Sequence, residues 1–363
     1  MTAASRLVSL DVFRGLTMAA MVIVNNPGDW STVYAPLLHA PWHGLTPTDL
    51  IFPFFLFIVG VSITLAKRSA ATGAAVFRRS LLIFALGMLL SLYPRFDVAT
   101  VRVPGVLQRI ALCYLLVALF HRKVQTSPRV IALTLTAAAL LLAGYWALIW
   151  RDLTPDGNLG AAIDRAVFGP HLWRQSRTWD PEGLLSTMPA VATTLTGLAA
   201  GLALTRFASQ RERLTAIATW SAGALVAGCL WSMVFPLNKA LWTSPYVLVT
   251  SGCAGLLLAA MHALLDGRDD RSLRLRAMRP FVILGRNALL LFVVSGVLAK
   301  TLALIRVDDG RNATIPLARW MYLSWFAPLA APRNASLLYA VATLALLFAL
   351  LWWLDRRRWY LRV

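Results

Sequence analysis

The sequence predicts an all-α protein, a polytopic transmembrane helical bundle of about ten spans with both termini in the cytoplasm. Three observations predict this fold class. Hydrophobic residues make up 58% of the 363 residues and charged residues only 14%, whereas about a quarter of an average soluble domain is charged. Apolar segments of roughly 18 residues or more recur, each long enough to cross a hydrocarbon core about 30 Å thick. The longest polar interval, 151–183, is too short for a soluble domain.

We therefore expect one integral membrane domain over residues 1–363, because helices close their own backbone hydrogen bonds where lipid offers no partner. The two longest outer loops, 151–183 and 303–335, contain several aromatic residues and are expected to cap the external face. The apolar segments place the spans near 8–25, 49–66, 76–93, 104–121, 129–150, 184–205, 213–235, 244–265, 280–302 and 336–354.

Basic residues set the expected orientation of a chain whose net charge is +19. Most of them fall on one side of the predicted spans: Arg6, Lys67, Arg68, Arg78, Arg79, Arg122, Lys123, Arg129, Arg206, Arg211, Arg213, Arg268, Arg271, Arg274, Arg276, Arg279, Arg356, Arg357, Arg358 and Arg362. The short segments on the other side contain only Arg95, Arg102 and Lys239. Because short cytoplasmic loops are rich in Lys and Arg, this pattern favours cytoplasmic termini and contact with anionic membrane lipids. Charge placed in this way does not indicate nucleic-acid binding.

The first span carries polar residues near both of its ends. Asp11 and Arg14 interrupt its apolar run and no convincing cleavage site follows, so we expect this segment to be retained as a span. Asn25 and Asn26 precede a Pro-Gly pair that would end the helix. A side-chain amide at that position can also orient a substrate or stabilise a developing oxyanion.

The segment "HAPWHGLTPTD" before the second span brings together His39, His43 and Asp49. Gly44 and Pro47 allow the chain to turn, so Asp49 can meet His39, fix one imidazole nitrogen and leave the other as a proton acceptor. The alternative interpretation is that both histidines are wet interfacial residues. No metal site is expected, because a proline disrupts a helix between the histidines and no third ligand is evident.

Further polar residues recur in the later spans and beside them. Ionisable groups at membrane depth cost several kcal/mol, so they normally face a partner or a cavity. In chain order these residues are Gln108, Arg109, Asp180, Glu182, Asn238, Lys239, Arg286 and Asn287. The structural alternatives are an ion pair between Arg109 and Asp49, helix capping by the two acidic residues, and an exposed Lys239.

The predicted topology divides these groups into an outer and a cytoplasmic set. Asp11, Arg14, Arg286 and Asn287 fall near the cytoplasmic ends of the first and ninth spans. The last two suit a phosphate-bearing ligand, although a lipid headgroup or an internal salt bridge is equally consistent. Two polar sites at opposite ends of one bundle imply either a substrate that crosses the membrane or a ligand long enough to reach both sites.

Together these segments resemble the heparan-α-glucosaminide N-acetyltransferase family. The segments "SLDVFRGLTM", "NNPG", "HAPWHGLTPTDLIFPFFLFIVG", "PGVLQRIALCY", "DPEGLLST", "FPLNKALWTS" and "GRNALLLF" occur in the family's order and span nearly the whole chain. The resemblance is to a bacterial, ten-span branch, without the extra N-terminal luminal segment of the eukaryotic enzyme.

The resemblance implies transfer of an acetyl group from cytosolic acetyl-CoA to an amino-sugar or glycan acceptor on the far side of the membrane. His39 matches the family's active-site histidine in its His-Ala-x-Trp element. Asn25 or Asn26, and Asp49, match positions that line the same site. His43 departs from the eukaryotic enzyme, which carries asparagine there.

We accordingly expect His39 to act as general base or transient acyl acceptor, supported by Asp49 and Asn25. The residues expected to bind the acceptor are Asn26, His43, Arg109, Glu182, Asn238, Lys239 and Trp242. The residues expected to bind acetyl-CoA are Asp11, Arg14, Gln108, Arg286 and Asn287.

An amino-sugar transporter is the alternative function, because the same pockets could bind and release a sugar without altering it. No inverted repeat is visible to favour it. An acyltransferase needs CoA at the cytoplasmic site and proton chemistry at His39, and a transporter needs neither. The resemblance further implies a bacterial cytoplasmic membrane, a periplasmic acceptor and a homodimer.

Overall fold

The computed structural model describes residues 7–66, 72–266, 272–308 and 313–361. The predicted all-α class is confirmed, with one short antiparallel strand pair, β1 (Arg306–Asp308) and β2 (Thr314–Pro316), in the described ranges. The α-helices are α1 (Val8–Asn25), α2 (Ile51–Leu65), α3 (Gly73–Leu92), α4 (Val106–Val124), α5 (Val130–Ile149), α6 (Leu159–Phe168), α7 (Thr187–Arg206), α8 (Gln210–Trp231), α9 (Ser244–Leu265), α10 (Ser272–Arg286), α11 (Ala288–Leu304), α12 (Leu317–Met321) and α13 (Pro332–Arg356).

A helix occupies each of the ten predicted span ranges. Eight helices in the described parts of the chain are long and apolar enough to cross a membrane, and the pair α10–α11 makes nine. That pair bends by 71° where we expected one straight span over 280–302, because the helix breaks at Asn287. The fourth predicted span is α4, which is long enough to cross but ends in a basic last turn. Among the basic residues named above, Arg6, Lys67, Arg68, Arg268, Arg271 and Arg362 lie outside the described residues.

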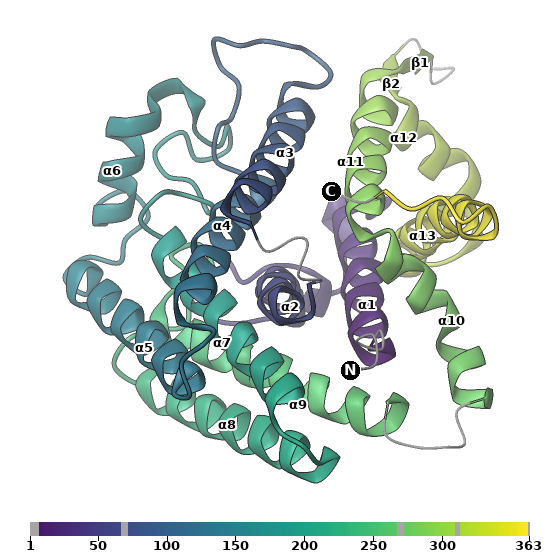
Figure 1. Ribbon diagram of the computed structural model, residues 1–363. Helices are drawn as coiled ribbons and strands as arrows, with labels where there is room; N and C mark the ends of the chain where they lie inside the picture. Colours follow the sequence, from purple (N-terminus) through teal and green to yellow (C-terminus); the bar gives the residue numbers. More distant parts are fainter. Residues whose placement is uncertain (1–6, 67–71, 267–271, 309–312, 362–363) are drawn as a thin grey trace.

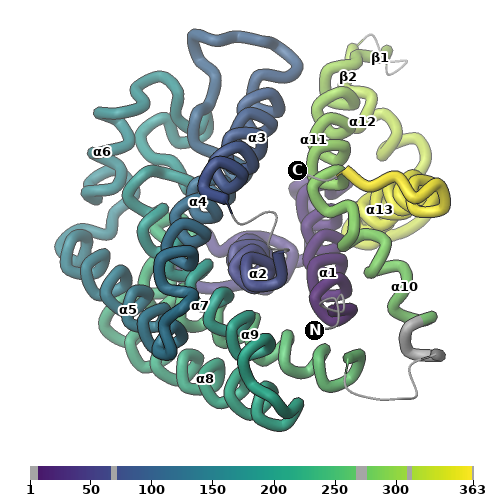
Figure 2. The backbone as a smooth tube through the Cα atoms, in the orientation of Figure 1, coloured from purple at the N-terminus to yellow at the C-terminus, as the bar shows by residue number. Residues whose placement is uncertain are grey.

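The helices form two groups on either side of α2. In Figure 1 α2 is seen nearly end-on at the centre, with α3 to α8 on one side and α1 with α10 to α13 on the other, while α9 runs below from the first group to beneath α1. The chain path in Figure 2 shows that the C-terminal helices return to lie beside α1, far from them in sequence. The principal packing pairs are α2 with α7, α8 with α9, α1 with α10, and α3 with α4.

Glycines permit the closest of these helix contacts. A Cβ atom at Gly60 of α2 would lie 2.0 Å from the carbonyl oxygen of Thr194, and one at Gly197 of α7 would lie 2.0 Å from that of Phe57. Small residues allow backbones to approach in this way where lipid supplies no hydrophobic driving force between helices. The α2–α7 pair is therefore a backbone-to-backbone contact that holds the central helix.

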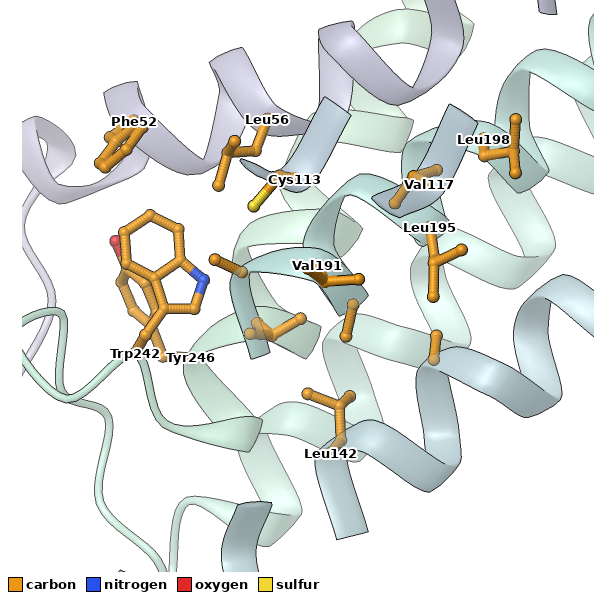
Figure 3. Packing of buried hydrophobic residues seen from close by; sticks show 14 of the residues in the cluster. Phe52, Leu56, Cys113, Val117, Leu142, Val191, Leu195, Leu198, Trp242 and Tyr246 are labelled. Atoms are coloured by element: carbon orange, nitrogen blue, oxygen red, sulfur yellow. The ribbon is translucent and has the colours of Figure 1, made fainter. Parts of the chain in front are cut away.

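The largest core cluster packs α2, α4, α5, α7 and α9 together (Figure 3). The indole of Trp242 is fully buried there, 5.0 Å from the ring of Phe52 and 5.3 Å from that of Tyr246, measured between centroids. Its Nε1 donates to Thr193 over 3.1 Å. This cluster anchors the start of α9 and the loop before it, which carries Lys239.

The two long loops lie differently. Segment 151–183 contains α6 and the 3₁₀ turn Gly169–His171, and its backbone at Leu153 accepts a hydrogen bond from the indole of Trp42. Segment 303–335 contains β1, β2, α12 and the π-helical turn Tyr322–Phe326, and packs on α11 and α13. Among the described residues of the two segments, only those of the first line the cavity described below.

We expect Gly60→Ala to destabilise the fold, because the new methyl group would overlap the α7 backbone. Overpacking of this kind costs about 1–3 kcal/mol. The measurement is the thermal unfolding midpoint of the detergent-purified protein. Gly223→Ala in α8 is the matched control, because a Cβ there meets nothing within 4 Å and alanine is the better helix former. Equal midpoints for the two variants would contradict the close α2–α7 contact.

Candidate active site

One cavity of about 1170 Å³ joins the two polar regions that the sequence separates. At one end it is lined by His39, Asp49, Glu182 and Lys239, which we call the histidine end. At the other it is lined by Arg14, Arg79, Arg122 and Arg286, which we call the arginine end. The volume exceeds the usual range of about 300–1,000 Å³ for small-molecule sites, so the cavity has room for a long ligand.

The cavity runs along the helices and not across them. On α4 both Val106 and Gln125, just past the end of the helix, line it. At 1.5 Å per residue these positions are about 28 Å apart, close to the ~30 Å of a hydrocarbon core. Its middle is apolar, with residues such as Met18, Phe55 and Phe292 on the wall. A ligand can therefore be held at both faces of the bundle at once.

At the histidine end, the carboxylate of Asp49 orients the imidazole of His39. The Oδ1 atom of Asp49 lies 2.7 Å from Nδ1 of His39. The side chain of His39 is 50% exposed and that of Asp49 only 1%. A buried carboxylate accepts the Nδ1 hydrogen, so the lone pair of Nε2 remains available to accept a proton. The structure thus brings the predicted pair together in the geometry of a general base.

The loop between the two residues is built by the turn chemistry that the sequence indicated. Gly44 has φ +121°, a conformation that side chains other than glycine rarely adopt, and its N–H donates to the carbonyl of Leu237 over 2.8 Å. Pro47 begins the 3₁₀ turn Pro47–Leu50, which contains Asp49. The Oδ2 atom of Asp49 then accepts N–H bonds from Ala40 and Thr46 at 3.1 and 3.0 Å.

Lys239 comes from the opposite wall to the same ring. Its Nζ lies 3.0 Å from Nδ1 and 3.1 Å from Nε2 of His39, and 3.9 Å from Oδ1 of Asp49. Burial lowers the pKa of Lys239 below its ordinary value, although Glu182 and Asp49 oppose this effect. The alternative in which Lys239 is simply an exposed lysine is therefore wrong.

A tight turn holds Lys239 in place. Asn238 is fully buried, its Oδ1 accepts the N–H of Leu241 over 2.8 Å, and its Nδ2 lies 3.3 Å from Nδ1 of His43. Trp242 closes the turn with φ +55°. Asn238, His43 and Trp242 do not line the cavity, so their observed contacts support the turn beneath Lys239 and the loop beside His39.

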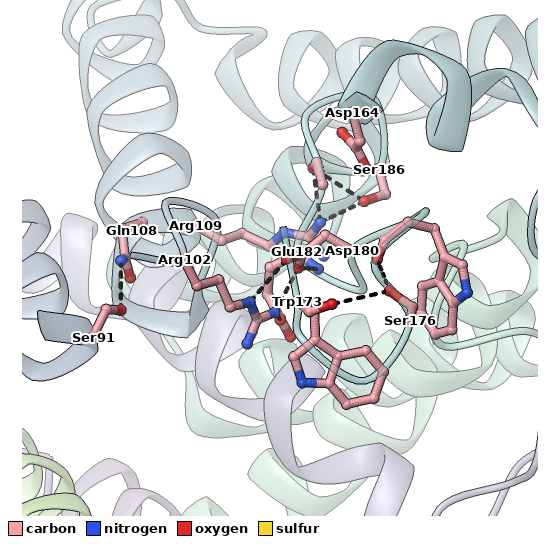
Figure 4. Close-up of polar contacts among 12 residues, drawn as sticks. Ser91, Arg102, Gln108, Arg109, Asp164, Trp173, Ser176, Asp180, Glu182 and Ser186 are labelled. Atoms are coloured by element: carbon pink, nitrogen blue, oxygen red, sulfur yellow. Dashed lines mark hydrogen bonds and ion pairs between the residues drawn. The ribbon is translucent and has the colours of Figure 1, made fainter. Parts of the chain in front are cut away.

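A second charge cluster lies at the same end (Figure 4). Arg102 donates through Nε to Asp180 over 2.8 Å and through Nη2 to both Asp180 and Glu182. Burial would lower the pKa of Arg102, but Glu182 and Asp180 outweigh it and raise the pKa above the ordinary value. Burial alone would likewise raise the pKa of Glu182, but Arg102, Arg109 and Lys239 together lower it. The acidic pair thus binds Arg102 instead of capping the next helix.

Arg109 and Gln108 lie behind the cavity wall. Arg109 is buried and donates to the carbonyl of Gly183 over 3.0 Å and to the hydroxyl of Ser186, so its observed partners differ from the ion pair with Asp49 considered above. Its guanidinium also lies 5.2 Å from the ring of Trp242. Gln108 contacts Ser91, at 3.5 Å (Figure 4). Neither side chain lines the cavity.

Three tryptophans line the histidine end without having been predicted there: Trp42, Trp173 and Trp179. The ring centroids of Trp42 and Trp179 are 5.1 Å apart, and those of Trp173 and Trp179 are 5.5 Å apart. Aromatic faces beside carboxylates suit the apolar face and the amine of an amino sugar. Arg102 was missed as well, although its place among only three basic residues in short outer segments was the available signal.

At the arginine end the cations come from several helices. Arg14 donates through Nη1 to the carbonyl of Gly285 at 3.3 Å and through Nη2 to Ser62 at 3.0 Å, and it pairs with Asp11 at 3.3 Å. Arg286 pairs with Asp355 at 3.1 Å. Arg79 and Arg122, which the sequence placed among the cytoplasmic basic residues, both line the cavity.

The break between α10 and α11 leaves buried polar atoms without partners. Both side-chain polar atoms of Asn287, and Nε of Arg286, have no hydrogen-bond partner among the described residues. Asn287 is 1% exposed and does not itself line the cavity, but both of its neighbours, Arg286 and Ala288, do. Because a buried polar group without a partner costs about 1–3 kcal/mol, this break suits a polar ligand that supplies one.

Of the two asparagines at the end of α1, only Asn25 lines the cavity. Asn26 donates from Nδ2 to the carbonyl of Val22 over 2.7 Å. Asp11 lies one turn before Arg14 and does not line the cavity. In the described residues, no group of three or more His, Cys, Asp or Glu side chains is arranged to hold a metal ion.

The sequence of this site region matches a known catalytic family. A model of heparan-α-glucosaminide N-acetyltransferase, catalytic, matches residues 6–229. The chain belongs to this family. That match includes His39, Asp49, Arg102 and Glu182 and ends before Lys239.

Two relatives are similar over most of this chain. The heparan-α-glucosaminide N-acetyltransferase of Mus musculus is 28% identical over 364 aligned positions, which cover 80% of this chain and 53% of the mouse protein. That of Homo sapiens is 29% identical over 358 positions, which cover 79% and 52%. The chain therefore spans about half the length of the curated relatives it matches. Its long apolar helices make this family member an integral membrane protein.

Asp164 of α6 makes the histidine end sensitive to pH. Its Oδ1 accepts the N–H of Leu184 over 2.8 Å, and burial, with the nearby charge of Asp180, raises its pKa to about 6. The folded state thus binds this proton more tightly than the unfolded chain, whose aspartates titrate near 3.9. Its contribution to stability is complete below about pH 4 and is lost as the pH rises through 6.

We therefore expect Asp164→Asn to be more stable than wild type at pH 7.5, by about 2 kcal/mol, and equal to it near pH 4. Asparagine keeps the Oδ1 acceptor and removes the buried charge. The measurement is the difference in thermal midpoint between the two proteins across this pH range. Asp156→Asn, at an exposed position of the same segment, is the control. A difference that does not vary with pH would contradict the raised pKa.

Proposed function

We propose that this protein transfers an acetyl group from acetyl-CoA, bound from the cytoplasmic side, to the amine of an amino sugar or glycan on the outer side. One observation carries the proposal: a single cavity joins the oriented His39–Asp49 pair to a cluster of arginines about one membrane thickness away. An acyl-CoA has the matching shape, with phosphates at one end and a thioester at the end of a long, narrow arm.

The arginine end suits the phosphates of the donor. Arg14, Arg79, Arg122 and Arg286 line it, and guanidinium groups bind phosphate through paired hydrogen bonds. The unpartnered Nε of Arg286, a residue that lines the cavity, is a further group that a bound ligand can satisfy. The basic residues of this end face the cytoplasm in the predicted topology, where acetyl-CoA is available.

The apolar middle of the cavity suits the pantetheine arm, and the histidine end receives the thioester. There His39 takes the proton from the acceptor amine at Nε2, and Asp49 stabilises the imidazolium that forms. The ammonium of Lys239 and the amide of Asn25 are placed to stabilise the developing oxyanion. His39 then returns the proton to the leaving thiolate.

The acceptor binds at the histidine end of the cavity, beside its three tryptophans. Trp42, Trp173 and Trp179 offer faces for a sugar ring, and Glu182 offers a carboxylate for its amine. Segment 151–183 supplies three of these four groups, so we assign it the role of an outer cap on a single membrane acyltransferase domain. An oriented histidine favours transfer over transport, because acyl transfer requires a general base and the transport of an unaltered sugar does not.

The test of this proposal is turnover of acetyl-CoA by the detergent-purified protein with glucosamine as acceptor. Wild type should release CoA and form N-acetylglucosamine. His39→Ala should lose about 10²- to 10⁴-fold in rate, the usual contribution of a positioned general base, with acetyl-CoA affinity retained. His171→Ala, which removes a histidine that bonds the Val101 carbonyl away from the cavity, is the control. Sugar uptake by proteoliposomes without CoA release would instead establish a transporter.

The arginine end offers a matched pair of variants that tests donor binding. Arg78 and Arg79 are both exposed, but only Arg79 lines the cavity. We expect Arg79→Gln to weaken acetyl-CoA binding about tenfold, the loss of one charge-assisted contact of about 1.4 kcal/mol. Arg78→Gln should leave the affinity unchanged. The measurement is the dissociation constant of acetyl-CoA, and an equal loss in both variants would point to general surface charge.

A further inference from the structure

The ε-amine of Lys239 lies about equally close to both ring nitrogens of His39 and is therefore near the nitrogen that an acceptor amine must approach. The Nδ1 hydrogen of His39 is held by Asp49, so Nε2 is the nitrogen that can accept a proton. Nζ of Lys239 lies 3.1 Å from that nitrogen and lines the cavity. An incoming amine must also come within about 2.6–3.2 Å of this base to deliver its proton, so Lys239 and the acceptor compete for the same base.

The surroundings of Lys239 also allow it to act as a nucleophile. Its side chain is 22% exposed and is held by the buried turn around Asn238, and burial lowers its pKa, which raises the fraction of neutral amine. Lys123, at the end of α4, is exposed and does not line the cavity.

We propose that Lys239 is an internal acetyl acceptor, acetylated by the bound donor when the external acceptor is absent. This inference rests on the proposed function, because it needs acetyl-CoA at the histidine end. Nζ of neutral Lys239 attacks the thioester carbonyl, a C–N bond forms, and the C–S bond breaks. His39 takes the proton from nitrogen and passes it to the thiolate, so that one amine and one acetyl-CoA give one acetamide and one CoA.

The product should inhibit the enzyme. An acetamide is neutral, so it cannot supply the cation placed beside Asp49 and Glu182 for the oxyanion. It is also bulkier than the amine and fills the acceptor position beside Nε2. With an acceptor present, its amine displaces Nζ from His39 and Lys239 remains an ammonium ion. The supply of acceptor therefore determines whether Lys239 is acetylated and the enzyme inhibited.

The experiment incubates the full-length, detergent-purified protein with trideuteroacetyl-CoA, with and without saturating glucosamine, and follows label on Lys239 and Lys123 by peptide mass spectrometry. The deuterated label separates new modification from any already present. We expect Lys239 to be labelled at least about tenfold faster than Lys123. His39→Ala should slow labelling at Lys239 by about 10²-fold or more and leave Lys123 unchanged, and glucosamine should suppress labelling at Lys239 alone. Lys239→Arg should abolish the CoA released without acceptor.

Each other outcome overturns the inference. Labelling of Lys239 no faster than Lys123, or unaffected by His39→Ala, would mean ordinary chemical acetylation. An unlabelled Lys239 in a protein that acetylates glucosamine would leave the proposed function intact and refute the internal acceptor. An unlabelled Lys239 in a protein that neither binds nor consumes acetyl-CoA would refute both.

Discussion

One buried carboxylate organises the histidine end. Asp49 accepts hydrogen bonds from the ring of His39 and from the backbone of Ala40 and Thr46, while its own carbonyl accepts the hydroxyl of Tyr246 over 2.6 Å. The carboxylate therefore sets the tautomer of the base and closes the loop that carries it, and the main-chain carbonyl of the same residue fixes that loop to α9. Taking this carboxylate out of water is costly unless all of its acceptor positions are satisfied, which is why the loop and the ring form as one unit.

The remaining charges at this end obey the same constraint. Arg102 neutralises Asp180 and Glu182 together, and Lys239 lies between Glu182 and Asp49. Each of these groups has a counter-charge or a hydrogen bond within reach, so the cavity can carry charge where lipid alone could not. The network also joins segment 151–183 to the bundle, so that the same ion pairs hold the cap and shape the mouth of the cavity.

The sequence was informative where the physics is local. Apolar length predicted the helix ranges, and Gly44 and Pro47 predicted the turn that brings His39 to Asp49 over only ten residues. It was less informative where partners are distant. Arg109 was a natural partner for Asp49, yet it bonds the start of α7. Trp242 was expected to bind the acceptor, yet it is fully buried in the core. Each of these two side chains had several possible partners, and the packing of α4, α7 and α9 selected among them.

The sequence by itself determined a membrane bundle and a histidine–aspartate pair, because hydrocarbon length and turn chemistry act within a short stretch of chain. Only the tertiary structure decided that Lys239 meets His39 from 200 positions away, that three tryptophans line the same end of the cavity, and that this cavity reaches the arginines of α1, α3, α4 and α10. These contacts arise from helices that pack through glycine and buried apolar surface. Close packing of that kind is cooperative over the whole bundle and leaves no local signature in the sequence.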